Sequence, residues 1–172
     1  MTINNIKLNK GFSIMEIIIY LAIFTTISIV VINSFIIILS SFKTIRSNHD
    51  LLDSGSIAME KISREIRQAK NTDLINTTST ALWLNSTDSS GSDAVVKIIK
   101  ESNALNLYRS TSTPNLLGNI LSSNIIVNSI SFDHISTTNS EGIKIKMILQ
   151  DTRIKTRPTA TFYDTVILRG GY

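Results

Sequence analysis

The residue types that most often carry out catalysis or bind metals are few in this chain, and they are scattered. His49 and His134 are the only histidines among 172 residues, and there is no cysteine. The two histidines fall in different predicted elements, with no carboxylate cluster, phosphate-binding loop or nucleophile motif beside them. We therefore interpret both as solvent-facing residues and expect a non-enzymatic protein without a cofactor.

Two further groups of polar residues could bind ions. Asp88, Ser90, Ser92 and Asp93 place oxygen atoms at near-alternate positions, as Ca²⁺ loops do. The terminal bidentate glutamate of such loops is missing, so we favour a solvated loop over a Ca²⁺ site.

A run of basic residues near the C-terminus could contact the phosphates of a nucleic acid. Its members are Lys144, Lys146, Arg153, Lys155 and Arg157. Strand alternation alone produces such a charged outer face, so we favour that interpretation over DNA binding. The net charge of the whole chain is only +4, which gives no general reason to expect an acidic partner.

The most informative motif is Lys10-Gly11-Phe12-Ser13-Ile14-Met15-Glu16, which precedes an apolar run. Gly11 has no side chain, so a protease can approach the backbone there closely. Ser13 and Glu16 also fit a helix capping box, in which Ser caps the helix and Glu reaches back three residues. That alternative explains Ser13 and Glu16, but it leaves Lys10-Gly11-Phe12 without a role.

The apolar run predicts a membrane helix. No charged residue occurs from Ile17 to Phe42, and Ile17–Leu39 is almost entirely apolar over 23 residues. About 20 such residues span the hydrocarbon core of a bilayer. A cleavable secretory signal has a shorter apolar region of about 7–15 residues and a small-residue cleavage site, which this chain lacks. A carboxylate such as Glu16, at the edge of hydrocarbon, is costly unless it is paired.

The motif and the run together resemble the processing site of type IV pilins and type II secretion pseudopilins. The resemblance implies a cytoplasmic leader 1–11, cleavage between Gly11 and Phe12 by a membrane prepilin peptidase, and N-methylation of Phe12. It also implies that Glu16, the fifth mature residue, pairs with the Phe12 amine of a neighbouring subunit during assembly. The C-terminal part of the chain would then lie outside the cytoplasmic membrane.

The elements that follow fit the same plan. We expect a membrane and filament-core half-helix over 12–42 and an amphipathic half-helix over 43–70. Ile45, Leu52, Met59 and Ile66 recur every seven residues in the second half, with Ile62 and Ala69 between them. Such a stripe usually packs on its own domain.

Residues 71–172 are predicted to form a β-rich head that packs against 43–70, because short β-like runs alternate with turns. The expected strands are 81–84, 95–100, 105–109, 125–135, 143–150 and 162–168, with a turn at Glu141-Gly142. The predicted fold class is α+β, with a long N-terminal helix on an antiparallel sheet.

Four short segments are similar to parts of J-type minor pseudopilins and their type IV pilus counterparts. They are Tyr20–Phe24, Ile62–Ala69, Leu107–Arg109 and Thr165–Arg169. The resemblance implies a structural subunit that primes assembly at a filament tip, with other pilin-like subunits, the prepilin peptidase and the inner membrane as partners. The alternative is a single-span sensor or adhesin module with an uncleaved anchor.

Overall fold

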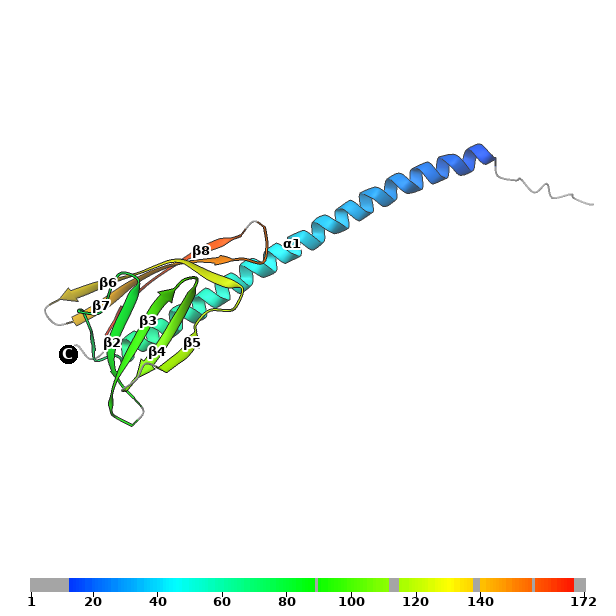
Figure 1. The fold of residues 1–172 in the computed structure, drawn as a ribbon. Helices are drawn as coiled ribbons and strands as arrows, with labels where there is room; N and C mark the ends of the chain where they lie inside the picture. The colour runs from blue at the N-terminus through cyan, green and yellow to red at the C-terminus, as the bar shows by residue number, and fades with distance from the viewer. Residues whose placement is uncertain (1–12, 89, 112–114, 138–139, 156, 169–172) are drawn as a thin grey trace, which may run out of the picture. The chain divides into compact units, whose positions relative to one another are not determined.

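The computed structural model describes residues 13–168, apart from 89, 112–114, 138–139 and 156. It has an α+β fold with one long N-terminal helix and two antiparallel sheets (Figure 1). Helix α1 spans Ile14–Gln68. The chain divides into two compact units, Met1–Lys43 and Thr44–Tyr172.

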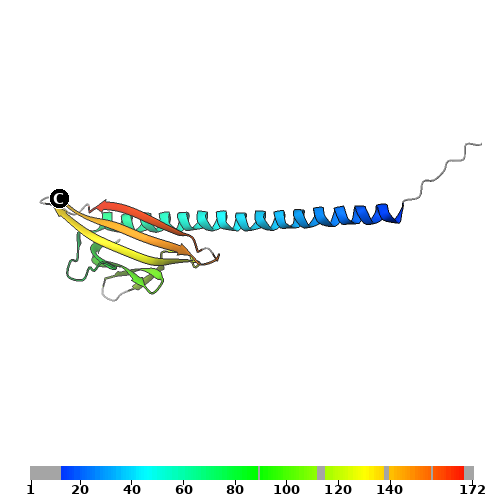
Figure 2. The same ribbon diagram turned by 90° about the horizontal axis from the view of Figure 1, so that it is seen from above.

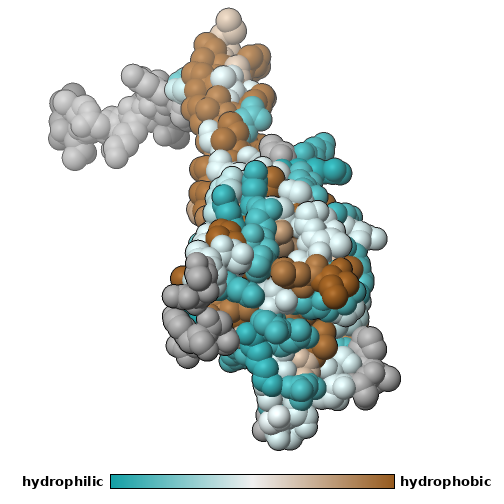
Figure 3. All heavy atoms as spheres, turned by 90° about the vertical axis from the view of Figure 1, so that its left-hand side faces the viewer, coloured by the Kyte–Doolittle hydropathy of each residue, from teal (hydrophilic) through white to brown (hydrophobic). Residues whose placement is uncertain are grey.

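In the first unit, α1 carries an 18-residue window that is long and apolar enough to cross a membrane, and none of this window is buried. Side chains such as Ile18, Phe24 and Ile37 are more than half exposed. In Figure 3 the segment of α1 that belongs to this unit is mostly brown, the colour of hydrophobic residues.

In the second unit, strands β1–β5 form a five-stranded antiparallel sheet in chain order. Its strands are β1 (Asn71–Thr72), β2 (Ala81–Thr87), β3 (Asp93–Glu101), β4 (Ala104–Ser110) and β5 (Asn115–Asn119). Burial alternates along β2 and β3, as expected for a sheet with one face on the core.

A three-stranded antiparallel sheet follows, with strand order β6-β7-β8. It consists of β6 (Ile125–Thr137), β7 (Ser140–Asp151) and β8 (Thr159–Ile167). The outer edge of β6 meets the first sheet and its loops, because Val127 N–H donates to the Asn103 carbonyl and Phe132 N–H to the Ser79 carbonyl. Figure 2 shows the three long strands running alongside the C-terminal part of α1.

Both sheets and the helix share one apolar core. Ile62 and Ile66 of α1, Leu84 and Ile98 of the larger sheet, and Ile145 of the smaller sheet are all fully buried. The core therefore fixes the second half of α1 against the sheets, as the amphipathic pattern predicted.

The buried face of α1 differs from the predicted stripe at its N-terminal end. Ile45 and Leu52 are 64% and 55% exposed, whereas Ser47, Ser54 and Gly55 face the core. The heptad pattern was wrong here because the core-facing positions are filled by small residues. These leave room for polar and aromatic side chains that reach in from the smaller sheet.

The strand predictions were close, with two omissions and one error. The short strands β1 and β5 were missed, because two or five residues with little alternation give no periodic signal. Glu141 and Gly142 were predicted as a turn, but they belong to β7. Gly142 is buried and pairs with Ile135 and Ile167, so this glycine serves strand pairing and not a turn.

Candidate functional site

The start of α1 is the first candidate site. Gly11 and Phe12 lie outside the described residues. The Ser13 carbonyl accepts hydrogen bonds from the N–H groups of Glu16, at 3.0 Å, and Ile17, at 3.2 Å. Ser13 therefore occupies the cap position before the first helical residue, Ile14, but the reciprocal side-chain bonds of a capping box are not among the hydrogen bonds of the described residues.

The Glu16 carboxylate has a partner that the sequence analysis did not single out. The Tyr20 hydroxyl donates a hydrogen bond of 2.8 Å to Glu16 Oε1. The two residues are four apart, so they share one face of the helix, and this spacing could have revealed the pair. Between them lie only isoleucines, and Tyr20 thus supplies a hydrogen-bond donor where the flanking residues offer none.

The hydroxyl side chains of the apolar segment bond to the helix itself. Thr25 and Thr26 both donate to the Ala22 carbonyl at 2.9 Å, and Ser28 donates to the Phe24 carbonyl at 2.8 Å. Ser34 bonds to the Val30 carbonyl in the same way. These bonds satisfy hydroxyls that would otherwise be costly in hydrocarbon.

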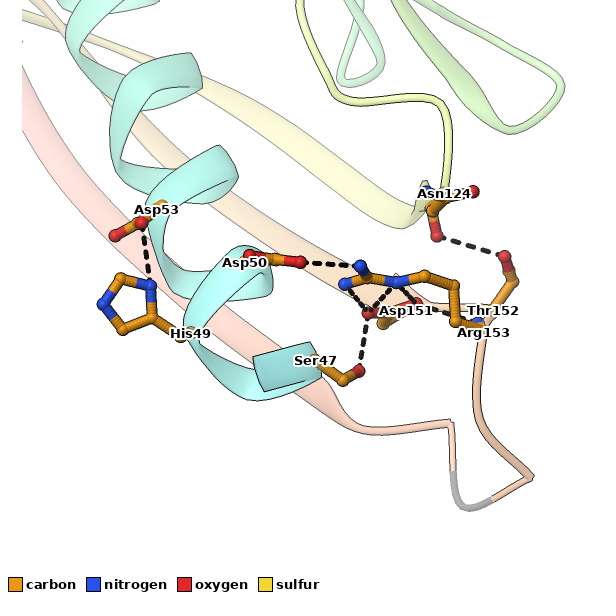
Figure 4. A network of polar contacts seen from close by, with 8 residues as sticks. All are labelled: Ser47, His49, Asp50, Asp53, Asn124, Asp151, Thr152 and Arg153. Carbon is orange, nitrogen blue, oxygen red and sulfur yellow. Dashed lines mark hydrogen bonds and ion pairs between the residues drawn. The ribbon is translucent and has the colours of Figure 1, made fainter. Parts of the chain in front are cut away.

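A second polar site joins α1 to β7 in the head. Asp151, the last residue of β7, is fully buried, and Ser47 donates a hydrogen bond of 2.6 Å to its Oδ2. The Arg153 guanidinium binds the same carboxylate through Nε and Nη2, and its Nη1 reaches Asp50 Oδ2 at 2.6 Å. Figure 4 shows Arg153 between the two carboxylates, one from the helix and one from the sheet.

Charge and hydrogen bonds stabilise this buried carboxylate. The hydrogen bonds from Arg153, followed by the one from Ser47, hold the pKa of Asp151 at about 2, although burial acts in the opposite direction. Asp151 and Asp50 in turn raise the pKa of Arg153. A buried charge is tolerated only when it is paired and hydrogen-bonded, and both conditions are met here.

Two more polar contacts fix the helix farther along. Ser63 donates a hydrogen bond of 2.5 Å to Asp164 Oδ2 of β8. Glu65 accepts one of 2.6 Å from Arg109 Nη2 of β4, and its side chain is only 10% exposed. Because these residues belong to both sheets, α1 is held on two sides by polar contacts as well as by the core.

The residues that suggested ion or nucleic-acid binding have other roles in the structure. Asp88 accepts bonds from the N–H groups of Ser90 and Ser92, so its carboxylate caps its own turn. Asp93 forms an ion pair with Lys70 at 2.6 Å. Within the described ranges, no group of three or more His, Cys, Asp or Glu side chains could hold a metal ion.

The two histidines have different environments. His49 is exposed and lies 2.9 Å from Asp53, one turn farther along α1. His134 is not the solvent-facing residue that we expected, because its side chain is only 20% exposed and lies 3.7 Å from Glu141. The structure places the two on α1 and β6, and it does not bring them together as a pair.

The predicted basic cluster divides into three parts. Lys144 and Lys146 lie exposed on β7, and Lys146 lies over the Tyr163 ring at 5.7 Å from its centroid. Arg153 is neutralised by Asp50 and Asp151. Lys155 and Arg157 are exposed in the loop between β7 and β8.

The chain was compared with protein-family models, with curated proteins and with solved structures, and none of them matches it.

Proposed function

We propose that this chain is a minor subunit of a type II secretion pseudopilus or type IV pilus, with a J-like minor pseudopilin as the closest type. The observation that carries the proposal is the motif Lys10-Gly11-Phe12 with Glu16, placed directly before a helix of membrane-spanning length. In this role the protein is structural and has no enzymatic activity. It is anchored in the inner membrane with its C-terminal head outside, and it helps to prime assembly at a filament tip.

The surroundings of Glu16 support the proposed assembly step. Tyr20 occupies Oε1 of the Glu16 carboxylate. Among the described residues, no hydrogen bond reaches Oε2, which leaves it open to a donor from another molecule. The new amino terminus that cleavage would create at Phe12 carries a positive charge, and an apolar environment strengthens its attraction to a carboxylate.

The exposed face of α1 in the head supports contacts with other subunits. Ile45 and Leu52 are seven residues apart, so they lie on one side of the helix, and both are more than half exposed. Large apolar side chains aligned in this way suit packing against a second helix.

The processing step is tested by expressing the full chain with and without a prepilin peptidase and measuring the mass of its amino terminus. We expect a chain that begins at methylated Phe12 when the peptidase is present. Gly11→Val should leave the leader attached, because its branched side chain blocks the approach to the cleaved bond. Thr2→Val, a change to the same residue type away from the cleaved bond, is the matched control and should be processed normally.

An intact leader in the wild type would contradict the proposal and favour an uncleaved anchor of a sensor or adhesin. Normal cleavage of Gly11→Val would contradict the assignment of the site.

A further inference from the structure

The loop between β7 and β8 lies beside α1 at the end of the head where the helix enters it. Ser47 and Asp50 of α1 contact Asp151 and Arg153, which lead into this loop. Figures 1 and 2 both place the loop next to the first helical turns of the 44–172 unit. Residues that are far apart in the sequence therefore share one surface.

This surface carries exposed cations. Arg46, Lys155 and Arg157 are exposed, and no ion pair involves them among the residues that the structure describes. The nearby acids have other partners. Asp50 and Asp151 both bind Arg153, Asp151 is fully buried, and Asp53 lies beside His49 one turn farther from the membrane segment than Asp50.

The loop holds Arg157 in a backbone conformation that is unusual for its residue type. Its φ is +42°, in the left-handed region that Gly and Asn favour. The turn is closed by Arg157 N–H donating to the Ile154 carbonyl at 3.0 Å, and Gln150 Nε2 donates to the Arg157 carbonyl at 3.3 Å. Arginine at such a position costs stability, and strain of this kind is concentrated at functional sites.

The position of Arg46 along α1 determines what these cations would meet. The uncharged run ends at Phe42, and Arg46 follows four residues later, or about 6 Å along a helix. The headgroup layer on each side of a bilayer is about 5–8 Å thick. Under the proposed membrane anchoring, on which this step rests, this short chain distance alone brings Arg46 within reach of the lipid phosphates.

We infer that Arg46, Lys155 and Arg157 form a docking surface for the headgroups of anionic phospholipids. Each cation near an anionic membrane surface contributes about 1 kcal/mol of attraction, or about a fivefold change in an equilibrium constant. Binding at this surface fixes the orientation of the head on the membrane before the subunit joins a filament.

The test uses the full chain reconstituted in vesicles of phosphatidylcholine, alone or mixed with phosphatidylglycerol. The chain has no cysteine, so Thr159→Cys, an exposed residue beside the loop, gives a single site for a fluorophore. Lipids with a nitroxide on the headgroup quench the fluorophore when the loop lies at the surface. Gln68→Cys, at the other end of the head's helical segment, is the control label.

We expect stronger quenching at position 159 in the anionic vesicles, with a difference that added salt reduces. Lys155→Gln with Arg157→Gln should lower the ratio of docked to undocked heads about 25-fold, or about fivefold per charge. The control, Lys144→Gln with Lys146→Gln, removes the same charge from β7 and should leave the ratio unchanged.

Equal quenching in both kinds of vesicle, or an equal loss in the control variant, would overturn the inference while leaving the anchoring intact. A chain that floats with neither kind of vesicle would overturn the proposed anchoring, and the inference with it. Binding of duplex DNA or inorganic phosphate by the same cations, without a response to anionic lipid, would also overturn the lipid assignment.

Discussion

At Gly55, helix propensity and tertiary packing favour different residues: helix propensity favours alanine, whereas packing requires glycine. A Cβ atom at this position would lie 2.1 Å from Phe162 Cζ, far inside contact distance. The Phe162 ring of β8 thus occupies the space that a side chain on α1 would fill. Glycine in a helix interior usually lowers stability by about 0.5–1 kcal/mol relative to alanine. The helix alone would therefore favour alanine at position 55, and the Phe162 ring explains why glycine is found there.

Gly55→Ala is expected to destabilise the head by about 1–2 kcal/mol, because overpacking outweighs the gain in helix propensity. The measurement is urea unfolding of the chain from Thr44 onward. Ser56→Ala, at an exposed neighbouring position, should change the free energy of unfolding by less than about 0.5 kcal/mol. Adding Phe162→Leu should recover part of the loss, and a gain in stability from Gly55→Ala alone would refute the packing argument.

At the scale of elements, the junction of α1 with β7 depends on a buried charge. Asp151 is fully buried, yet its pKa lies at about 2 because of Arg153 and Ser47. A carboxyl whose pKa is lower in the folded than in the unfolded chain stabilises the fold above its unfolded pKa. That contribution is lost as the pH falls towards the folded pKa.

We therefore expect the head to lose about 2 kcal/mol of stability through Asp151 between about pH 5 and pH 2. Asp151→Asn should remove this part of the acid dependence and lower the stability at pH 7, since Arg153 loses one of its two ionic partners and keeps only Asp50. Denaturant unfolding at a series of pH values measures both effects. Asp133→Asn, an exposed carboxylate on β6, is the matched control, and an unchanged acid profile for Asp151→Asn would contradict the prediction.

At the scale of the whole molecule, the two units have different surfaces. The apolar window of α1 in the first unit is unburied, whereas the second unit encloses a core drawn from α1 and both sheets. The surface of the head in Figure 3 is a mixture of hydrophilic and hydrophobic patches. We therefore expect the head to fold in water without the first unit.

A chain that begins at Thr44 should be soluble and monomeric and unfold in one cooperative transition. The full chain should require detergent or lipid, because its apolar side chains are exposed over more than five helical turns. Light scattering and thermal unfolding followed by circular dichroism test both statements. Aggregation of the shorter chain, or a full chain soluble without detergent, would contradict this division of roles.

The sequence alone determined the helix, the apolar segment and most strands, because these are local patterns that repeat every 3.6 or two residues. It placed Ile62 and Ile66 in the core, and the 101–104 turn between β3 and β4. Short strands such as β1 contain too few residues to show such a repeat. The proposed processing site at Gly11 and Phe12 rests on the motif.

The small residues of α1 that face the core could be identified only from the tertiary packing. The Ser47–Asp151 and Gly55–Phe162 contacts join residues more than a hundred positions apart, and no local period encodes such pairs. The same holds for the basic run. The structure separated Lys144 and Lys146 from Lys155 and Arg157, because β7 ends at Asp151 and the last two residues lie in the loop that follows it.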